Sequence, residues 1–153
     1  MDDSSMSKVP VELIGDRLYG VEYKPHELSI YGEQVNFHLR WSPIADDLAQ
    51  AATTHYRLLV LEIVAEVPQD GLDPRQGQVI ELLKIGWECE LRTVEPAAAE
   101  DLADPPEHLR HALVAIADTV NDLARRAGYE APLGTDVVDY LLAASAQRAI
   151  DMA

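Results

Sequence analysis

The amino-acid sequence predicts an α+β protein in which a four-stranded antiparallel sheet is followed by two helices packed on one of its faces. Segments that alternate apolar and polar residues come first, the clearest being VNFHLRW at residues 35–41. A long segment with helical spacing, residues 104–128, comes after them. Strands and helices segregated in this way are typical of α+β proteins. Since 153 residues suit one domain, we expect a disordered lead-in at residues 1–10 and a single domain at residues 11–153.

The first predicted strand lies within residues 13–23 and places Tyr19, Val21 and Tyr23 on one face. Pro25 ends this strand or confines it to an edge, because proline cannot donate to the ladder. The apolar residues at 28–32 are interpreted as the continuation of a bent edge strand.

Three further strands are predicted at residues 35–41, 56–67 and 79–93. Each carries a complete apolar face, and the segment at 56–67 is also apolar over part of its second face, which is typical of a central strand. Gly86 inside the last strand predicts a bulge or a close backbone approach. Residues 44–54 are expected to form a polar connection with a helical turn.

The predicted helix at residues 104–128 has clear ends. Asp104 is expected to be the N-cap, Pro105 the first helical residue, and Gly128 the left-handed residue that stops the helix. A main apolar stripe faces the sheet. A thinner apolar set, Val114 and Ala117, lies well round from that stripe, and with Asn121 it forms the candidate oligomer interface. A second helix is expected to begin at Thr135.

The formal net charge of −15 is the strongest compositional feature. It opposes binding to nucleic acids and anionic membranes and favours basic partners. No run of about 18 apolar residues is present, so no membrane insertion is expected. The single cysteine, Cys89, cannot form an internal disulfide, and the polar N-terminus has no signal-peptide pattern. We therefore expect a cytoplasmic protein.

Motifs for catalysis, nucleotide binding or metal binding are absent from the sequence. His108 and His111 have a spacing that two metal ligands could use, but a third ligand is missing and exposed histidines explain them better. Cys89 lies on an apolar strand face, so it is interpreted as a buried structural thiol. We expect no catalytic residue, no metal and no cofactor.

Aromatic residues on the predicted strands suggest a different kind of site. They share the faces that carry the other apolar residues, so each can belong to the core. Together they can exceed what two helices cover, which would leave an aromatic groove for an apolar partner. The candidate peptide-binding residues are Tyr19, Tyr23, Phe37, Trp41 and Trp87, with Trp41 the first choice because it ends its strand beside Pro43.

The order and spacing of these segments over about residues 13–142 resemble the SecB family of protein-export chaperones and its SecB-like relatives. Residues 19–25 (YGVEYKP) are similar to the family's first strand, and residues 35–47 (VNFHLRWSPIADD) to its second strand and acidic connection. Residues 80–91, with Gly86 and Trp87, resemble its fourth strand. Gly20 and Lys24 stand where the export chaperone has acidic residues that meet the translocation motor, and Val114, Ala115 and Ile116 replace its tyrosine-containing helix segment.

The resemblance implies an ATP-independent chaperone that holds unfolded or aggregation-prone client polypeptides in an apolar groove. The departures favour a specialised relative, such as a chaperone for an antitoxin. The resemblance also implies a homo-oligomer, either a dimer or a dimer of dimers. Two alternatives stay open: a small adaptor or inhibitor that binds one folded partner, and a small α+β enzyme or ligand carrier with a closed pocket.

Overall fold

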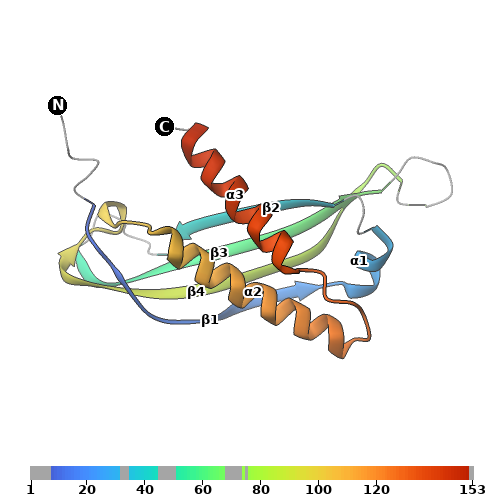
Figure 1. Ribbon diagram of the computed structural model, residues 1–153, viewed down its shortest axis with the longest axis horizontal. Coiled ribbons are helices and arrows are strands. Elements are labelled where there is room, and N and C mark those ends of the chain that lie inside the picture. Colours follow the sequence, from blue (N-terminus) through green and yellow to red (C-terminus); the bar gives the residue numbers. More distant parts are fainter. Residues whose placement is uncertain (1–7, 32–34, 45–50, 68–73, 75, 152–153) are drawn as a thin grey trace.

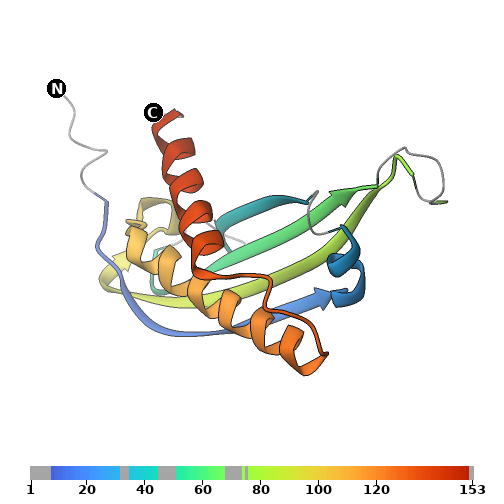
Figure 2. The ribbon, with the colours of Figure 1, turned by 45° about the vertical axis from the view of Figure 1, so that its right-hand side comes forward.

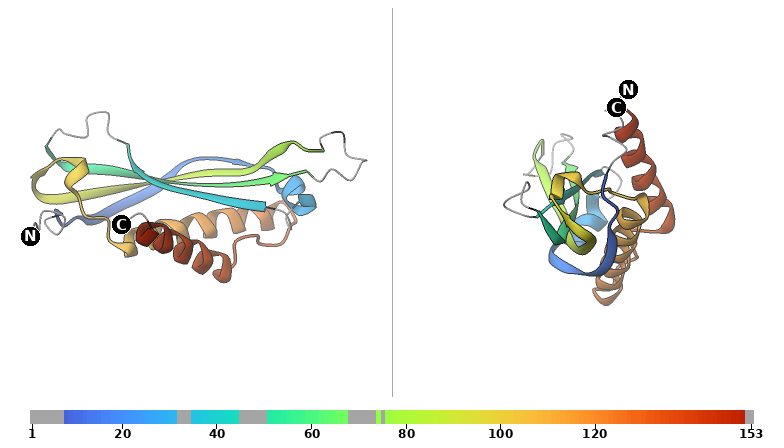
Figure 3. Two further views of the ribbon diagram at one scale, coloured as in Figure 1. Left: turned by 90° about the horizontal axis from the view of Figure 1, so that it is seen from above. Right: turned by 90° about the vertical axis from the view of Figure 1, so that its left-hand side faces the viewer.

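The computed structural model describes residues 8–31, 35–44, 51–67, 74 and 76–151. In this part of the chain, a four-stranded antiparallel sheet has the order β1-β4-β3-β2. Its strands are β1 (Glu12–Tyr23), β2 (Val35–Pro43), β3 (Ala52–Glu66) and β4 (Val79–Ala97). The helices are α1 (Pro25–Tyr31), α2 (Pro106–Arg126) and α3 (Thr135–Asp151), with a 3₁₀ turn at Ala99–Asp101. Figure 3 shows α2 and α3 on one side of the sheet, so the predicted α+β class is confirmed.

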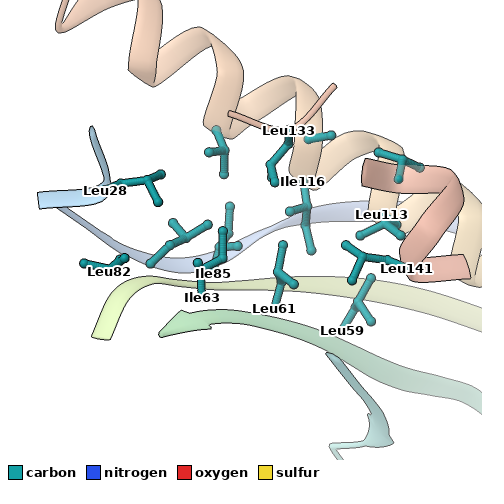
Figure 4. Close-up of a cluster of buried hydrophobic side chains, with 14 of the residues drawn as sticks. Leu28, Leu59, Leu61, Ile63, Leu82, Ile85, Leu113, Ile116, Leu133 and Leu141 are labelled. Carbon is teal, nitrogen blue, oxygen red and sulfur yellow. The ribbon is translucent and has the colours of Figure 1, made fainter. Parts of the chain in front are cut away.

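The core lies between that face of the sheet and the helices (Figure 4). The predicted core faces of β3 and β4 are confirmed: alternate residues of these strands, among them Leu59, Leu61 and Ile85, are fully buried. Leu113 and Ile116 of α2 pack onto them from above. The turn after α2 brings α3 back towards β2, as Figures 1 and 2 show. The two helices and the sheet therefore share one core.

The partly apolar second face of residues 56–67 led us to expect that β3 is covered on both sides over part of its length, but the helix-free face of the sheet carries no second layer of described elements. Val60 is nevertheless only 5% exposed. It lies in a shallow hollow of about 530 Å³ that Tyr19, Leu58 and Arg40 also line. Neighbouring side chains on the sheet itself therefore shield Val60.

A β-bulge in β1 changes the face of the sheet on which its side chains lie. Leu18 pairs with Trp87, whereas Gly20 pairs with Gly86, so Tyr19 is an extra residue in the ladder. A Cβ built on Gly86 would meet Tyr19 Cδ1 at 3.4 Å and Leu58 Cδ1 at 3.3 Å. Tyr19 therefore lies on the helix-free face, not on the face of Tyr23 as the alternation predicted. The nearest neighbours over Gly86 are therefore side chains, and not the closely approaching backbone that was predicted.

Residues 25–31 form a short helix, so the expectation of a bent edge strand there was wrong. Pro25 suits the first helical position, and Glu27 follows in the first turn. Leu28 and Tyr31 are one helical turn apart, and both are buried. A segment this short shows too few apolar residues to reveal its period.

The ends of α2 are partly as predicted. Gly128 has φ +87°, as expected for the residue that stops the helix. At the other end the N-cap is Pro105, and no side chain caps the helix. The prediction that Asp104 caps α2 was therefore wrong, and the first helical residue is Pro106.

The expected lead-in and the connection at residues 44–54 are only partly described. Val9 N donates to Asp101 O at 2.9 Å, and Ala103 N donates to Val9 O at 2.9 Å. Residues 1–7 and 45–50, including the expected helical turn, lie outside the described part. The connection is shorter than predicted, because β3 already begins at Ala52.

Candidate peptide-binding groove

A groove of about 650 Å³ opens where α1 and the turn between α2 and α3 flank the sheet. We call it the aromatic groove, and its lining is mostly apolar. Its residues are Tyr23, Pro25, Leu28, Ser29, Val35, Phe37, Ile63, Gly128, Tyr129, Glu130, Ala131, Pro132 and Val137. Tyr23 and Phe37 are thus the predicted peptide-binding residues that the structure brings together. A concave, largely apolar site with a few polar groups is typical of ligand-binding pockets.

The wall formed by the turn is held by Asn121 of α2. Its side-chain nitrogen donates to Leu133 O at 2.7 Å, and its Oδ1 accepts from Leu133 N at 2.8 Å. Gly128 supplies the left-handed conformation that turns the chain out of α2, and Tyr129 N then donates to Ala124 O at 2.9 Å. The wall is therefore fixed to α2 at both of its ends.

Tyrosine and histidine hydrogen-bonding groups lie at the groove. His26 Nδ1 of α1 is 3.1 Å from the Tyr129 hydroxyl, which links the two walls. Burial, and secondarily Tyr129, raise the pKa of Tyr23. The Tyr23 hydroxyl is protonated at neutral pH, as is usual for tyrosine, and can donate a hydrogen bond.

The two tryptophans do not line the aromatic groove. Trp41 and Trp87 are half-buried and pack against the core. Trp41 Nε1 donates to Asp104 Oδ1 at 3.0 Å, and Trp87 Nε1 donates to Asp16 Oδ2 at 2.7 Å. Buried indoles usually find such partners, so these contacts are typical of structural tryptophans.

Tyr19 is also away from the groove. It is 61% exposed and lines the hollow on the helix-free face with Arg40 and Lys84. The predicted aromatic set is therefore divided between two faces of the sheet.

The candidate interface residues differ in exposure. Val114 is 41% exposed and lines a shallow depression on α2, whereas Ala117 is 5% exposed within the single chain. Asn121 uses its amide to hold Leu133. Val114 is therefore the member of this set that a second chain could contact without rearrangement.

The side chains that could act as a nucleophile or as metal ligands have structural roles instead. Cys89 is fully buried, and its burial, together with Asp16 and Glu88, raises the pKa of its thiol to about 12. The thiol is therefore protonated at neutral pH, whereas a nucleophile must be a thiolate.

The two histidines that had the spacing of metal ligands differ in burial. His108 is buried and not exposed as expected, and His111 Nε2 lies 2.9 Å from Asp16 Oδ2. Over the described residues, no group of three or more His, Cys, Asp or Glu side chains could hold a metal ion.

Sequence reasoning missed two residues. Arg57, only 3% exposed, donates from Nε to Asp104 Oδ1 at 3.1 Å and from Nη2 to Ala99 O at 3.1 Å. The burial of Arg57 could have been predicted from the sequence, because Arg57 has the same alternation as Leu59, Leu61 and Ile63 and so lies on the helix-covered face. Tyr129 of the groove wall had no such signal, because its role depends on how the turn folds.

No protein-family model and no curated protein matches this chain. Among the described residues, no helix has the length and apolar character needed to cross a membrane.

Proposed function

We propose that this protein is an ATP-independent, SecB-like chaperone that holds extended apolar segments of unfolded client polypeptides in the aromatic groove. The observation that carries the proposal is the groove itself, because Tyr23 of β1, Phe37 of β2 and Tyr129 of the turn converge on one cavity of about 650 Å³. Aromatic side chains bury large apolar areas and adapt to many apolar partners. The net charge of −15 would keep a chaperone–client complex soluble.

The element order supports the SecB-like part of the proposal. Four antiparallel strands precede a long helix, a Gly- and Pro-containing turn and a second helix, which is the order on which the resemblance rests. We further propose a homo-oligomer, a dimer or a dimer of dimers, in which the exposed Val114 of α2 contributes to the contact.

The proposal is tested with a client that is unfolded in denaturant and diluted into buffer without nucleotide. The protein is expected to delay the light scattering of the aggregating client. Phe37→Ala should reduce this delay because it removes a groove-lining ring. Leu109→Ala is the matched control: Leu109 of α2 is half-buried against the same core but does not line the groove.

Both variants are first compared in thermal unfolding, since truncating a half-buried side chain also destabilises the fold. Full client protection by a folded Phe37→Ala variant would contradict the proposed site. A parent protein that delays no client but binds one folded partner stoichiometrically would instead establish the adaptor alternative.

A further inference from the structure

We infer that the client segment adds to the β2 edge of the sheet as a further strand, with some of its side chains entering the aromatic groove. This inference rests on the proposed function, because it states how the same client is bound. It predicts a requirement for backbone hydrogen bonds that an apolar groove alone would not impose.

The hydrogen-bond pattern of β2 determines which of its backbone groups face outward. Ile44 N donates to Tyr56 O at 3.1 Å, and the register pairs Pro43 with Arg57 and Trp41 with Leu59. Opposed residues in an antiparallel ladder alternate between hydrogen-bonded and non-hydrogen-bonded pairs. Ile44 belongs to a hydrogen-bonded pair, so the outward groups are the N–H and C=O of Val35, Phe37, Leu39 and Trp41.

These outward groups form a row that is open within the described part of the chain. No backbone hydrogen bond from another described element reaches Val35, Phe37, Leu39 or Trp41. The row covers seven residues, which is about 20 Å of strand. It ends at Pro43, which has no N–H to donate.

The β2 edge suits strand addition better than the β1 edge does. The register of β2 runs from Val35 to Pro43 without a shift, whereas that of β1 shifts between Leu13 and Gly15 and between Leu18 and Gly20. Such bulges disrupt the regular spacing of donors and acceptors at an edge. An incoming strand would therefore find a continuous ladder only at β2.

The side chains of the same four residues indicate what kind of molecule binds at this edge. Val35, Phe37, Leu39 and Trp41 are half-buried on the helix-covered face, and Val35 and Phe37 line the aromatic groove. Directly opposed residues of neighbouring strands place their side chains on the same face. Alternate side chains of an added strand would thus lie beside these four and reach the groove. The occupant is therefore an extended polypeptide segment that alternates apolar and polar residues.

The test uses a capped, uncharged peptide that alternates apolar residues with serine, and two isomers of it. One isomer carries N-methyl groups on the apolar residues, and the other carries them on the serines. A strand uses the N–H groups of alternate residues towards its neighbour. One isomer should therefore lose at least tenfold in affinity for the full-length protein, and the other should bind within about threefold of the parent peptide.

Antiparallel addition predicts that the isomer methylated on its apolar residues is the weaker one, because those residues lie directly opposite Val35 to Trp41. Equal affinities of the two isomers would overturn strand addition while leaving groove binding intact. A parent peptide that does not bind at all would instead contradict the proposed function.

Two variants of the protein test whether the outward N–H groups of β2 are needed for peptide binding. Leu39→Pro removes an outward N–H without removing a hydrogen bond to β3, and Leu39→Ala removes the same side chain but keeps the N–H. Both variants lose the Leu39 side chain, so Leu39→Ala measures that contact alone. If both variants unfold cooperatively, Leu39→Pro should bind the parent peptide about tenfold more weakly than Leu39→Ala does. Equal binding by the two variants would contradict strand addition. If Leu39→Pro does not fold, the peptide isomers still decide the question.

Discussion

Asp104 lies directly before Pro105, where a carboxylate commonly caps the following helix. In this protein its Oδ1 accepts from Trp41 Nε1 of β2 and from Arg57 Nε of β3. The Arg57 side chain is 4% exposed, so without Asp104 its charge would be buried with the backbone of Ala99 as its remaining acceptor. A buried charge without a counter-charge costs more than an open helix end, which explains why the carboxylate turns to the sheet.

Asp104→Ala is therefore expected to destabilise the protein by about 1–3 kcal/mol, because it removes an acceptor from a buried charge and from an indole. Asp118→Ala, at an exposed position of α2, is the matched control and should change little. Urea unfolding measures both. In a double-mutant cycle, Asp104→Ala and Trp41→Phe should be non-additive, since they share one hydrogen bond. Additive losses would show that this contact is not formed.

The face of the sheet on which Tyr19 lies was predicted wrongly from the sequence. Alternation places it with Tyr23, but one extra residue in β1 moves it to the opposite face. Gly20, a glycine inside the strand, is the one signal of that bulge in YGVEY, but it does not show which neighbouring residue is the extra one. Cys89, by contrast, was correctly expected to be buried, since β4 keeps its alternation at that position.

Among the elements, the turn between α2 and α3 determines the shape of the groove. Asn121 was expected at a subunit interface, yet both atoms of its amide bind the backbone of Leu133. Leu133 is 3% exposed, so these bonds anchor the turn to the core.

Asn121→Ala should cost about 1–3 kcal/mol, because it leaves the N–H and C=O of a buried residue without partners. Asp122→Ala is the control: it removes an exposed ion pair with Arg126 one turn away, worth about 0.3–0.5 kcal/mol. Thermal unfolding compares the two, and hydrogen exchange should be faster at residues 129–134 in Asn121→Ala alone. A protein of unchanged stability would mean that the turn does not depend on this contact.

The elements with a strong period were predictable, and the groove was not. Residues 35–41 alternate without a fault and form β2, and residues 135–151 form α3, which was expected to begin at Thr135. The short α1 was missed because seven residues span only two turns. The groove arises where Tyr23, Phe37 and Tyr129 meet, and these residues are far apart in the sequence. Tyr23 and Phe37 were identified as aromatic strand residues, but their convergence depends on tertiary packing.

At the scale of the whole molecule, three properties bear on the proposed function. The net charge of −15 favours basic clients. Among the residues that the structure describes, the sheet has an open edge at β2, and the aromatic groove lies beside the end of this edge. A chaperone of this kind would bury apolar client surface reversibly, with a negative heat-capacity change and without nucleotide.

The most direct test of the central claim is photo-crosslinking from two tyrosine positions. A benzophenone amino acid replaces Tyr129 in the groove wall or Tyr19 in the hollow of the helix-free face, so the two variants introduce the same reactive group. Each variant is irradiated with an unfolded client, and the adducts are measured by mass spectrometry. We expect client adducts from position 129 and few from position 19. Adducts mainly from position 19 would contradict the proposed site, because the client would then bind the opposite face of the sheet.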